Sequence, residues 1–389
     1  CPIIRDVEVM AEILISLGVK VTGVGTHSLH IDPARLKHYT VSPDLSTQLR
    51  ASIVLLAPLL VRFAKVNIGF PGGDTIGKRG VGTHFQVLEA LGTKFTPKGT
   101  VITGKTTAKT PAKHVFLDEA SVTATENGLM FAASLPQTTI IENAACEPHI
   151  TNLGQMLIKM GAQITGLGTN AVSITGVKRL HGTIFTVGPD YIDAGTFAIA
   201  AAATGGQVTI SPLNQPDMRM LLLYLSRFGV NYHWTSSNTL KILPSNLKVD
   251  SEQFGIKQKF QTRPWPGFPT DLMSPLIVLA TQTQGTMLLH DWMYETRMYF
   301  TDRLSLMGAN ITLCDPHRII VTGPTPLYAR HLPSPDIRAG MSLLIAALCA
   351  HGQSEIDHTE IIERGYEDPV GRLTKLNAKI KYIKSRHEI

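Results

Sequence analysis

Two kinds of apolar segment alternate along the chain, and each predicts a different kind of helix. Segments of the first kind are apolar at nearly every position, which predicts helices buried on all sides. We place them at 51–60, 123–135, 194–204, 272–281 and 338–350. Polar residues stand at their starts, where a helix attracts negative charge, so we expect these starts to face a shared anion-binding cleft. The polar residues are Arg50, Ser121, Asp193, Asp271, Asp336 and Arg338.

Segments of the second kind end in an apolar residue and usually a glycine, and a strand-like run follows within two residues. A glycine in the left-handed conformation often closes a helix, so this pattern predicts six helices that each lead into a strand. In 19–31 and 162–174 a G-x-G turn joins two strand-like runs, which predicts hairpins instead of dinucleotide-binding loops. The six junctions recur every 68 to 79 residues, at Leu17-Gly18, Leu91-Gly92, Met160-Gly161, Phe228-Gly229, Met307-Gly308 and Leu376-Asn377.

These repeats predict a mixed α/β protein of two domains. A chain of 389 residues exceeds one ordinary core, and six repeats divide naturally three and three. We therefore expect one domain over 1–188 and another over 189–389. Only five all-apolar helices accompany the six junctions, and a repeat needs both halves to cover its sheet. We expect the first half-repeat to be missing from this sequence, which begins at Cys1.

The composition fits a globular protein that binds small anions. Hydrophobic residues make up 43% of the chain, charged residues 17%, and the net charge is +6. This charge also suits a solvated basic surface or nucleic acid, but the basic residues are scattered and aromatic residues are only 6%, so we expect no nucleic-acid partner. The sequence contains no apolar run long enough to predict a membrane span. The cysteines are far apart, which argues against a zinc site or disulfides and suits a reducing cytoplasm. They are Cys1, Cys146, Cys314 and Cys349.

The stretch 71–84, PGGDTIGKRGVGTH, is the strongest candidate for a functional loop. It places Asp74, Lys78, Arg79 and His84 close together and leads directly into an apolar-periodic helix. Glycines let backbone N–H groups approach a ligand, the helix start favours negative charge, and arginine grips an oxyanion with two donors. The stretch therefore predicts an anion site, with an ordinary basic loop as the alternative.

Seven short motifs in order resemble the enolpyruvyl transferase family, and together they span nearly the whole chain. The resemblance is closest to members that act on UDP-N-acetylglucosamine. The Arg-Pro-Met-Gly-Arg type of signature, typical of members acting on shikimate 3-phosphate, is absent, so that acceptor is the alternative. The resemblance implies an inside-out α/β barrel fold, with two domains of three βαβαββ-like repeats that close on their substrates. The motifs lie at 49–52, 71–79, 120–127, 141–148, 268–272, 336–339 and 363–367.

The resemblance also implies a reaction. In it, the enolpyruvyl group of phosphoenolpyruvate moves to the 3′-hydroxyl of UDP-N-acetylglucosamine, and phosphate leaves. This step commits the sugar to peptidoglycan synthesis, and so to cell-wall growth, cell shape and division, in the cytoplasm. The implied partners are these two small molecules, with no cofactor, metal, nucleic acid or membrane. Such chemistry requires a proton donor, a base at the sugar hydroxyl, and cations for the phosphate and carboxylate.

Two aspartates match the catalytic positions of the family. Asp74 stands where most members have a reactive cysteine and some have aspartate, which implies that it donates a proton to C3 of phosphoenolpyruvate. Such a donor must be protonated, which the neighbouring Lys78 and Arg79 oppose. A turn residue is the alternative. Asp271 matches the base at the sugar hydroxyl, with a helix N-cap as the alternative.

Arginines match the anion-binding positions of the family. The resemblance implies that Arg79 contacts both substrates, that Arg364 clamps phosphoenolpyruvate and that Arg50 lies at the nucleotide. The alternatives are a surface salt bridge for Arg364 and a structural role for Arg50. Asp336 and Arg338 match an Asp-x-Arg linked to closure. The other matched substrate-binding positions are Gly80, Val81, Gly82, Thr83, Glu119, Ala120, Ser121, Val122 and Met293.

Several positions depart from the usual residues of the family. They concern the uracil side of the site more than the reaction centre, so another nucleotide sugar or a non-catalytic UDP-sugar-binding paralogue stays open. The expected missing half-repeat would carry the Lys-Asn pair of the family. Because aspartate is a poorer nucleophile than a thiolate, we expect insensitivity to fosfomycin, which alkylates the cysteine of other members. The departing residues are Gly80, Gly82, Thr83, Glu119, Cys146, Met273 and Thr296.

Overall fold

The computed structural model describes residues 1–74, 76–249, 252–253, 256–257 and 259–383. The chain forms two compact units. The first unit comprises Cys1–Asp74, Arg79–Gly188 and Pro264–Pro266. The second comprises Thr75–Lys78, Pro189–Arg263 and Gly267–Ile389.

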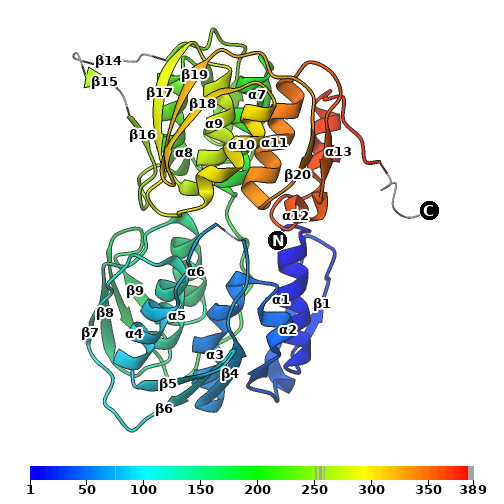
Figure 1. Cartoon of the computed structure of the whole chain (residues 1–389). Helices are drawn as coiled ribbons and strands as arrows, with labels where there is room; N and C mark the ends of the chain where they lie inside the picture. Colours follow the sequence, from blue (N-terminus) through cyan, green and yellow to red (C-terminus); the bar gives the residue numbers. More distant parts are fainter. Residues whose placement is uncertain (75, 250–251, 254–255, 258, 384–389) are drawn as a thin grey trace. The chain divides into compact units, whose positions relative to one another are not determined.

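The first unit contains six helices, two 3-10 turns and ten strands among its described residues (Figure 1). The helices and turns are α1 (Arg5–Ser16), η1 (Pro33–Arg35), α2 (Pro43–Ser46), η2 (Arg50–Leu55), α3 (Leu56–Phe63), α4 (Gly82–Ala90), α5 (Val122–Ala132) and α6 (Pro148–Lys159). The strands are β1 (Lys20–Thr22), β2 (His30–Asp32), β3 (Thr40–Val41), β4 (Lys65–Gly69), β5 (Thr93–Lys98), β6 (Val101–Thr106), β7 (His114–Phe116), β8 (Thr138–Glu142), β9 (Gln163–Thr165) and β10 (Ala171–Thr175).

Two four-stranded sheets of this unit have the same topology. Their strand orders are β3-β4-β6-β5 and β7-β8-β10-β9, in which the first pair is parallel and the others are antiparallel. Helix α3 covers the first sheet, α5 covers the second, and the two helices contact each other. Their meeting faces form one core that includes Leu56, Ile68, Leu129 and Ile141, each fully buried. β1 and β2 form a separate antiparallel hairpin.

The second unit repeats this plan around three buried helices (Figure 1). Its helices and 3-10 turns are α7 (Tyr191–Ala203), α8 (Gln215–Arg227), η3 (Thr270–Leu272), α9 (Met273–Thr281), η4 (Arg297–Phe300), α10 (Thr301–Leu306), α11 (Ile337–Cys349), α12 (Thr359–Glu363) and α13 (Pro369–Lys375). Its strands are β11 (Val208–Ile210), β12 (Tyr232–Ser236), β13 (Thr239–Ile242), β14 (Glu252–Gln253), β15 (Ile256–Lys257), β16 (Lys259–Gln261), β17 (Gly285–His290), β18 (Asn310–Asp315), β19 (Arg318–Gly323), β20 (His331–Pro333) and β21 (Glu355–Asp357).

The core of the second unit lies where its three all-apolar helices meet. α9 contacts α7 and α11, and every residue of α9 is buried. The sheet β16-β17-β19-β18 has the same strand order and directions as the two larger sheets of the first unit. Smaller sheets are β11-β13-β12, β14-β15 and the parallel pair β20-β21. The all-apolar segments therefore form the centre of each unit, as the hydrophobic pattern predicts.

The predicted buried helices are confirmed, with small shifts at their ends. The largest difference is at 51–60, which forms the 3-10 turn η2 followed by α3 instead of one helix. Pro58 lies in the first turn of α3 and has no N–H to bond to the carbonyl four residues earlier. An α-helix cannot run unbroken through this position without that bond, and a tighter turn precedes it instead.

The predicted helix closures are confirmed at all six junctions. The five glycines and Asn377 have positive φ angles, between 67° at Asn377 and 112° at Gly161. A strand follows the first five closures, but residues 378–383 form no strand, so that part of the prediction is wrong for the sixth copy. Here the bonds are local: Ile380 N donates to Ala378 O, and Thr374 Oγ1 donates to Ile380 O. A strand requires a neighbouring strand, and β20 and β21 pair only with each other among the described residues.

Candidate functional site

The two glycines that open the 71–84 loop are required by close backbone contacts. A Cβ atom on Gly72 would lie 1.6 Å from the carbonyl oxygen of Thr47. Gly73 has a φ of +112°, and its Cβ would lie 2.9 Å from the Cβ of Arg50. Gly72 N also donates to Ser46 O at 3.2 Å. The loop therefore lies directly against the turn that precedes and begins η2.

Arg50 fixes the far end of the same loop. Its Nη1 donates to Arg79 O at 2.9 Å, and its Nη2 donates to Gly80 O at 2.7 Å. The structure thus brings three of the predicted binding residues together, because the guanidinium of one holds the backbone of the other two. A Cβ on Gly80 or Gly82 would meet no heavy atom within 4 Å, so the loop backbone borders open space there.

Replacing Gly72 by alanine is expected to lower kcat/KM about 100-fold, because misplacing a reacting group by about 1 Å costs that much. The added methyl group overlaps Thr47 O and forces the loop away from η2. Steady-state kinetics and the melting temperature of Gly72→Ala measure the effect. Gly182→Ala is the matched control in the same unit, since a Cβ there meets nothing within 4 Å. Equal kinetics for the two variants would contradict this account.

Side chains join the start of α4 to the segment that leads into α5. Thr83 Oγ1 donates to Asp118 Oδ1 at 2.9 Å, and Asp118 N donates to the side chain of Gln86 at 3.1 Å. Ser121 N donates to Glu119 O at 2.7 Å, which makes a tight turn just before α5. The predicted positions in 80–83 and 119–122 therefore belong to two adjoining segments at the N-termini of α4 and α5. Such ends present free N–H groups and favour a phosphate.

The middle of the glycine-rich loop belongs to the second unit, whereas Asp74 and Arg79 belong to the first. Thr296 N donates to Ile76 O at 3.3 Å, and Lys78 N donates to the Glu295 carboxylate at 3.3 Å. Gly77 fits here because a Cβ would lie 2.1 Å from the Glu295 carboxylate. Thr75 lies outside the described residues.

Asp271 lies between two guanidinium groups in the second unit. Its Oδ1 accepts from Arg297 Nη2 at 2.9 Å, and its Oδ2 accepts from Arg338 Nε at 3.1 Å. The arginine side chains are 1% and 16% exposed, whereas the carboxylate side chain is 37% exposed. Burial alone would raise the pKa of Asp271, but Arg338 and Arg297 outweigh burial and lower this pKa to about 2. Asp271 is therefore an ionised carboxylate that solvent can reach.

Asp271 does not cap a helix, which was the alternative to its catalytic role, whereas Asp336 does. Neither η3 nor α9 has a side-chain N-cap bond, and both oxygens of Asp271 are engaged by arginines. Asp336 Oδ1 accepts from the backbone N–H groups of Arg338 and Ala339, at 2.9 and 3.0 Å, which caps α11. This cap sets the position from which Arg338 reaches Asp271. For α7 the cap is Asp190, and Asp193 pairs with Arg372 instead.

Arg297 belongs to this cluster but lies in none of the seven sequence motifs. Besides Asp271, its Nε lies 3.9 Å from Asp291 Oδ2, and the Asp291 side chain is fully buried. Asp291 accepts from Thr262, Thr270 and the backbone of Met293. The Nη1 of Arg297 is buried and has no hydrogen-bond partner within the described part of the chain. A lone arginine in the otherwise apolar run RMYF was the available signal, because a buried charge needs a partner.

Aromatic rings support the arginines of the second unit. Arg338 lies 5.1 Å from the ring centre of Tyr366, and the hydroxyl of that buried tyrosine lies 3.0 Å from Thr196 Oγ1. Arg364 is the C-cap of α12, two residues before Tyr366. The predicted residues Asp271, Met293 and Arg338 thus share one cluster, with Arg364 on the neighbouring helix end.

Two half-buried glutamates lie near each other in the first unit, Glu126 within α5 and Glu147 at the start of α6. Burial, reinforced by the charge of Glu147, raises the pKa of Glu126 to about 7. Burial also raises the pKa of Glu147. Cys146, which replaces a frequent arginine of the family, donates its Sγ–H to Trp265 O at 3.2 Å. Both carboxyl groups therefore hold a proton more tightly than an exposed glutamate does.

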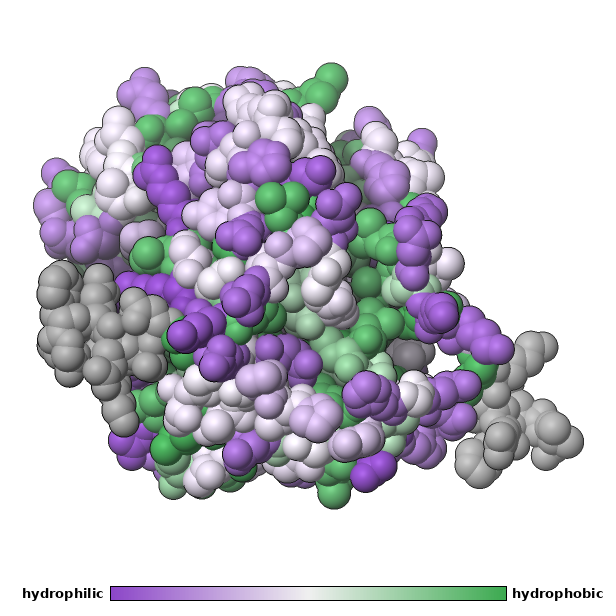
Figure 2. Space-filling view, turned by 90° about the horizontal axis from the view of Figure 1, so that it is seen from above, coloured by the Kyte–Doolittle hydropathy of each residue, from purple (hydrophilic) through white to green (hydrophobic). Residues whose placement is uncertain are grey.

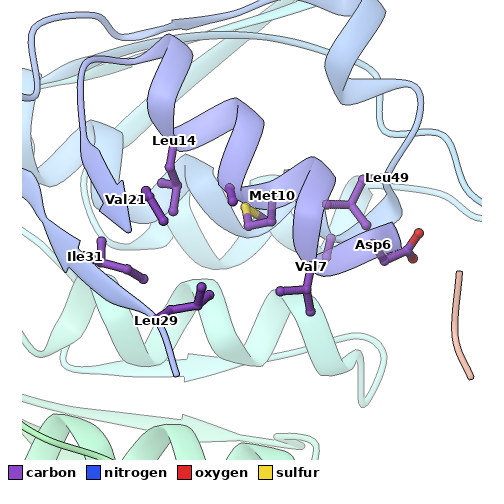
Figure 3. A pocket seen from close by; sticks show the side chains of 10 residues that line it. Asp6, Val7, Met10, Leu14, Val21, Leu29, Ile31 and Leu49 are labelled. Atoms are coloured by element: carbon purple, nitrogen blue, oxygen red, sulfur yellow. The ribbon is translucent and has the colours of Figure 1, made fainter. Parts of the chain in front are cut away.

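An apolar pocket of about 330 Å³ lies in the first unit between α1 and the β1–β2 hairpin (Figure 3). Its lining is apolar except for Asp6, and it includes none of the predicted site residues. Substrates that carry several negative charges do not suit such a lining. Over the part of the chain that the structure describes, no group of three His, Cys, Asp or Glu residues is placed to hold a metal ion.

The described helices include none that is long and apolar enough to cross a membrane. The face shown in Figure 2 mixes hydrophilic and hydrophobic residues. Exposed large apolar side chains occur in both units, for example Phe116 and Trp292.

Comparison with solved structures confirms the predicted fold. The enolpyruvyl transferase NikO from Streptomyces tendae superposes with a TM-score of 0.83 at 21% identity, over 98% of this chain and 88% of that one. The EPSP synthase from Acinetobacter baumannii superposes with a TM-score of 0.69 at 19% identity, over 95% and 86%. At these identities the likeness shows the fold alone, which is the enolpyruvyl transferase fold.

Residues 1–373 match the family described as EPSP synthase (3-phosphoshikimate 1-carboxyvinyltransferase), so the chain belongs to this enolpyruvyl transferase family. Among its relatives is a UDP-N-acetylglucosamine 1-carboxyvinyltransferase of Borreliella burgdorferi, 45% identical over 99% of this chain and 90% of the relative. Enzymes of the same name from Treponema denticola and Bacteroides thetaiotaomicron are 44% and 38% identical, each over 98% of this chain and 89% and 90% of the relative. The predicted family is thereby confirmed.

Proposed function

We propose that this chain is a transferase that moves the enolpyruvyl group of phosphoenolpyruvate to the 3′-hydroxyl of UDP-N-acetylglucosamine and releases phosphate. The observation that carries the proposal is the ionised, accessible carboxylate of Asp271 between two arginines. The carboxylate of Asp271 provides a base for the sugar hydroxyl, and the two arginines provide positive charge for the anionic co-substrate. Relatives at 38–45% identity that bear the name of this activity support the same assignment.

The proposed roles draw on residues of both units. In the first unit the N–H groups of 80–83 and 119–122 bind the diphosphate, Arg79 binds phosphate, and Asp74 donates a proton to C3 of phosphoenolpyruvate. In the second unit Asp271 accepts the proton of the sugar hydroxyl, whose oxygen bonds to C2. Phosphate then leaves from C2, and C3 loses a proton to restore the double bond. Arg338 and Arg364 bind the anionic groups of phosphoenolpyruvate.

The two arginines beside Asp271 have opposing effects: their charge favours binding of a substrate anion, but it also makes Asp271 less basic. With both in place, a carboxyl group of pKa about 2 is a poor proton acceptor. Arg338 is the more exposed of the two arginines, at 16%, so a substrate anion can pair with it. We propose that this anion draws positive charge away from Asp271 and so makes it more basic when both substrates are bound.

The acceptor is tested by measuring phosphate release from phosphoenolpyruvate with the full-length protein. We expect release with UDP-N-acetylglucosamine and a product heavier than the acceptor by the enolpyruvyl group. Shikimate 3-phosphate should give no release. Binding of UDP-N-acetylglucosamine without phosphate release would instead support the non-catalytic paralogue, and release only with another sugar nucleotide would support a different acceptor.

The compartment and the domain roles are part of the proposal. Phosphoenolpyruvate and UDP-sugars are cytoplasmic metabolites, so we propose that the enzyme acts in the cytoplasm in peptidoglycan synthesis. We also propose that residues 1–188 and 189–389 act as its two catalytic domains. The separate cores around α3 and α5 and around α7, α9 and α11 support this division.

A further inference from the structure

The first unit contains a buried histidine that the proposed reaction does not use. His84 lies in the first turn of α4 and is 2% exposed. Its Nε2 lies 2.8 Å from Thr123 Oγ1, in the first turn of α5. Burial, followed by the charge of Arg50, lowers the pKa of His84 to about 4, although the Val81 carbonyl opposes this. The ring is therefore neutral at physiological pH, and its burial keeps it from substrate.

Thr123, which His84 contacts, also accepts a hydrogen bond from the buried side chain of Asn127. Asn127 Nδ2 donates to Thr123 O at 3.0 Å and to Ile53 O at 3.1 Å, and its Oδ1 accepts from Ala57 N at 2.9 Å. Asn127 is fully buried. The starts of α4 and α5 and the junction of η2 with α3 are therefore linked through Thr123 and Asn127.

The His84–Thr123 bond has no duplicate in the described structure. The other side-chain bonds of the α4 start, from Thr83 and Gln86, reach residues 116–118, which precede the turn at 119–122. Among the described residues, His84 makes the one side-chain hydrogen bond between α4 and α5. Without it, the polar links between the two helix starts that the structure describes are indirect, through residues 116–118 or through Arg50 and Asn127.

We propose that His84 is a positioning residue for nucleotide binding. Its bond to Thr123 holds the loop 80–83 and the turn 119–122 at the separation that a diphosphate requires. The inference rests on the proposed function, in which these two segments bind the diphosphate. Free N–H groups bind phosphate well only when they are held in place beforehand, because ordering them during binding weakens the affinity.

The test compares His84→Phe, Thr123→Val and the double variant with wild type. Each single change keeps most of the volume and removes the hydrogen bond. We expect KM for UDP-N-acetylglucosamine to rise roughly 3- to 10-fold, the range for one hydrogen bond between neutral groups. The kcat and the KM for phosphoenolpyruvate should stay within about twofold of wild type. The double variant should be no worse than the worse single variant, since both remove the same bond.

Two further variants separate positioning from general stability. His84→Gln places an amide near the former Nε2 and should recover part of the nucleotide affinity. Thr139→Val is the matched control, because that buried hydroxyl of the same unit has no hydrogen-bond partner among the described residues. It should leave all three kinetic constants unchanged. A rise in both KM values with a fall in kcat and melting temperature for Thr123→Val would mean a structural role and would overturn the proposal.

Calorimetric titration with UDP alone gives an answer that does not depend on catalysis. The proposal predicts weaker UDP binding by His84→Phe and Thr123→Val by the same factor as the change in KM. Unchanged UDP binding by both variants overturns it. A wild-type protein that binds UDP but releases no phosphate contradicts the proposed reaction, while the binding ratio between the variants still decides the role of His84.

Discussion

Asp74→Asn is expected to lower kcat about 1,000-fold, within the range that general acid catalysis contributes. The amide keeps the shape of the side chain but cannot give a proton to C3 of phosphoenolpyruvate. Rapid-quench or steady-state assays of phosphate release measure the loss. Asp44→Asn is the matched control, because that aspartate is exposed on α2 of the same unit. Turnover by Asp74→Asn within tenfold of wild type would show that Asp74 is not the donor.

The residue at position 74 should also determine whether fosfomycin inactivates the enzyme. A carboxylate opens the epoxide poorly, so the wild-type enzyme should keep its activity and its mass after exposure. Asp74→Cys introduces a thiol, whose thiolate is the better nucleophile, and should be inactivated with time and gain one adduct. An adduct on Asp74 of the wild-type protein, found by mass spectrometry of its peptides, would contradict this expectation.

The helices of this fold could be predicted because their causes are local. All-apolar runs such as that of α9 have no face that tolerates water, so they must become the core of a unit. A residue that closes a helix in the left-handed conformation is a local requirement too, which is why Gly161 and even Asn377 could be identified. The strand expected after Asn377 depends on a partner strand, which no local pattern specifies.

The residues of the site could be predicted better than their interactions. The family motif identifies Arg50, but the sequence does not show that both of its Nη atoms donate to the loop backbone. Asp271 also lies in a motif, whereas Arg297 does not, and an ion pair between residues 26 positions apart leaves no periodic signal in the sequence. The bond between His84 and Thr123 was hidden for the same reason, since it spans 39 positions and joins two helices.

Asp271→Asn is expected to lower kcat about 1,000-fold, because an amide cannot accept the proton of the sugar hydroxyl. Steady-state assays of phosphate release measure the loss. Glu360→Gln is the matched control for the loss of a carboxylate, because Glu360 is exposed on α12, outside the Asp271 cluster, and this variant should keep the wild-type kcat.

The dependence of kcat/KM on pH tests how the two arginines act on the carboxyl group of Asp271. In the free wild-type enzyme the pKa of Asp271 is about 2, so its ionisation cannot produce an acid limb in kcat/KM above about pH 4.

Arg297→Met should move that limb into the measurable range. It removes one of the two charges that lower the pKa of Asp271, while burial continues to raise it. The carboxyl group then protonates at a higher pH, and kcat/KM should fall as the pH decreases through that new pKa. Arg297→Lys keeps the charge and should retain most of the wild-type profile.

The free energy of unfolding should also depend on the ionisation of Asp271. A depressed pKa means that ionised Asp271 stabilises the folded unit above its ordinary pKa of 3.8, and that this contribution disappears as the pH falls toward 2. Arg297→Met should therefore be less stable than wild type at neutral pH, and the difference should narrow as the pH falls from 3.8 toward 2, as denaturant unfolding followed by tryptophan fluorescence at several pH values will show. If the variant instead has a wild-type pH profile and a stability difference that stays the same at every pH, Arg338 alone governs the ionisation of Asp271, and Arg297 serves only the buried Asp291.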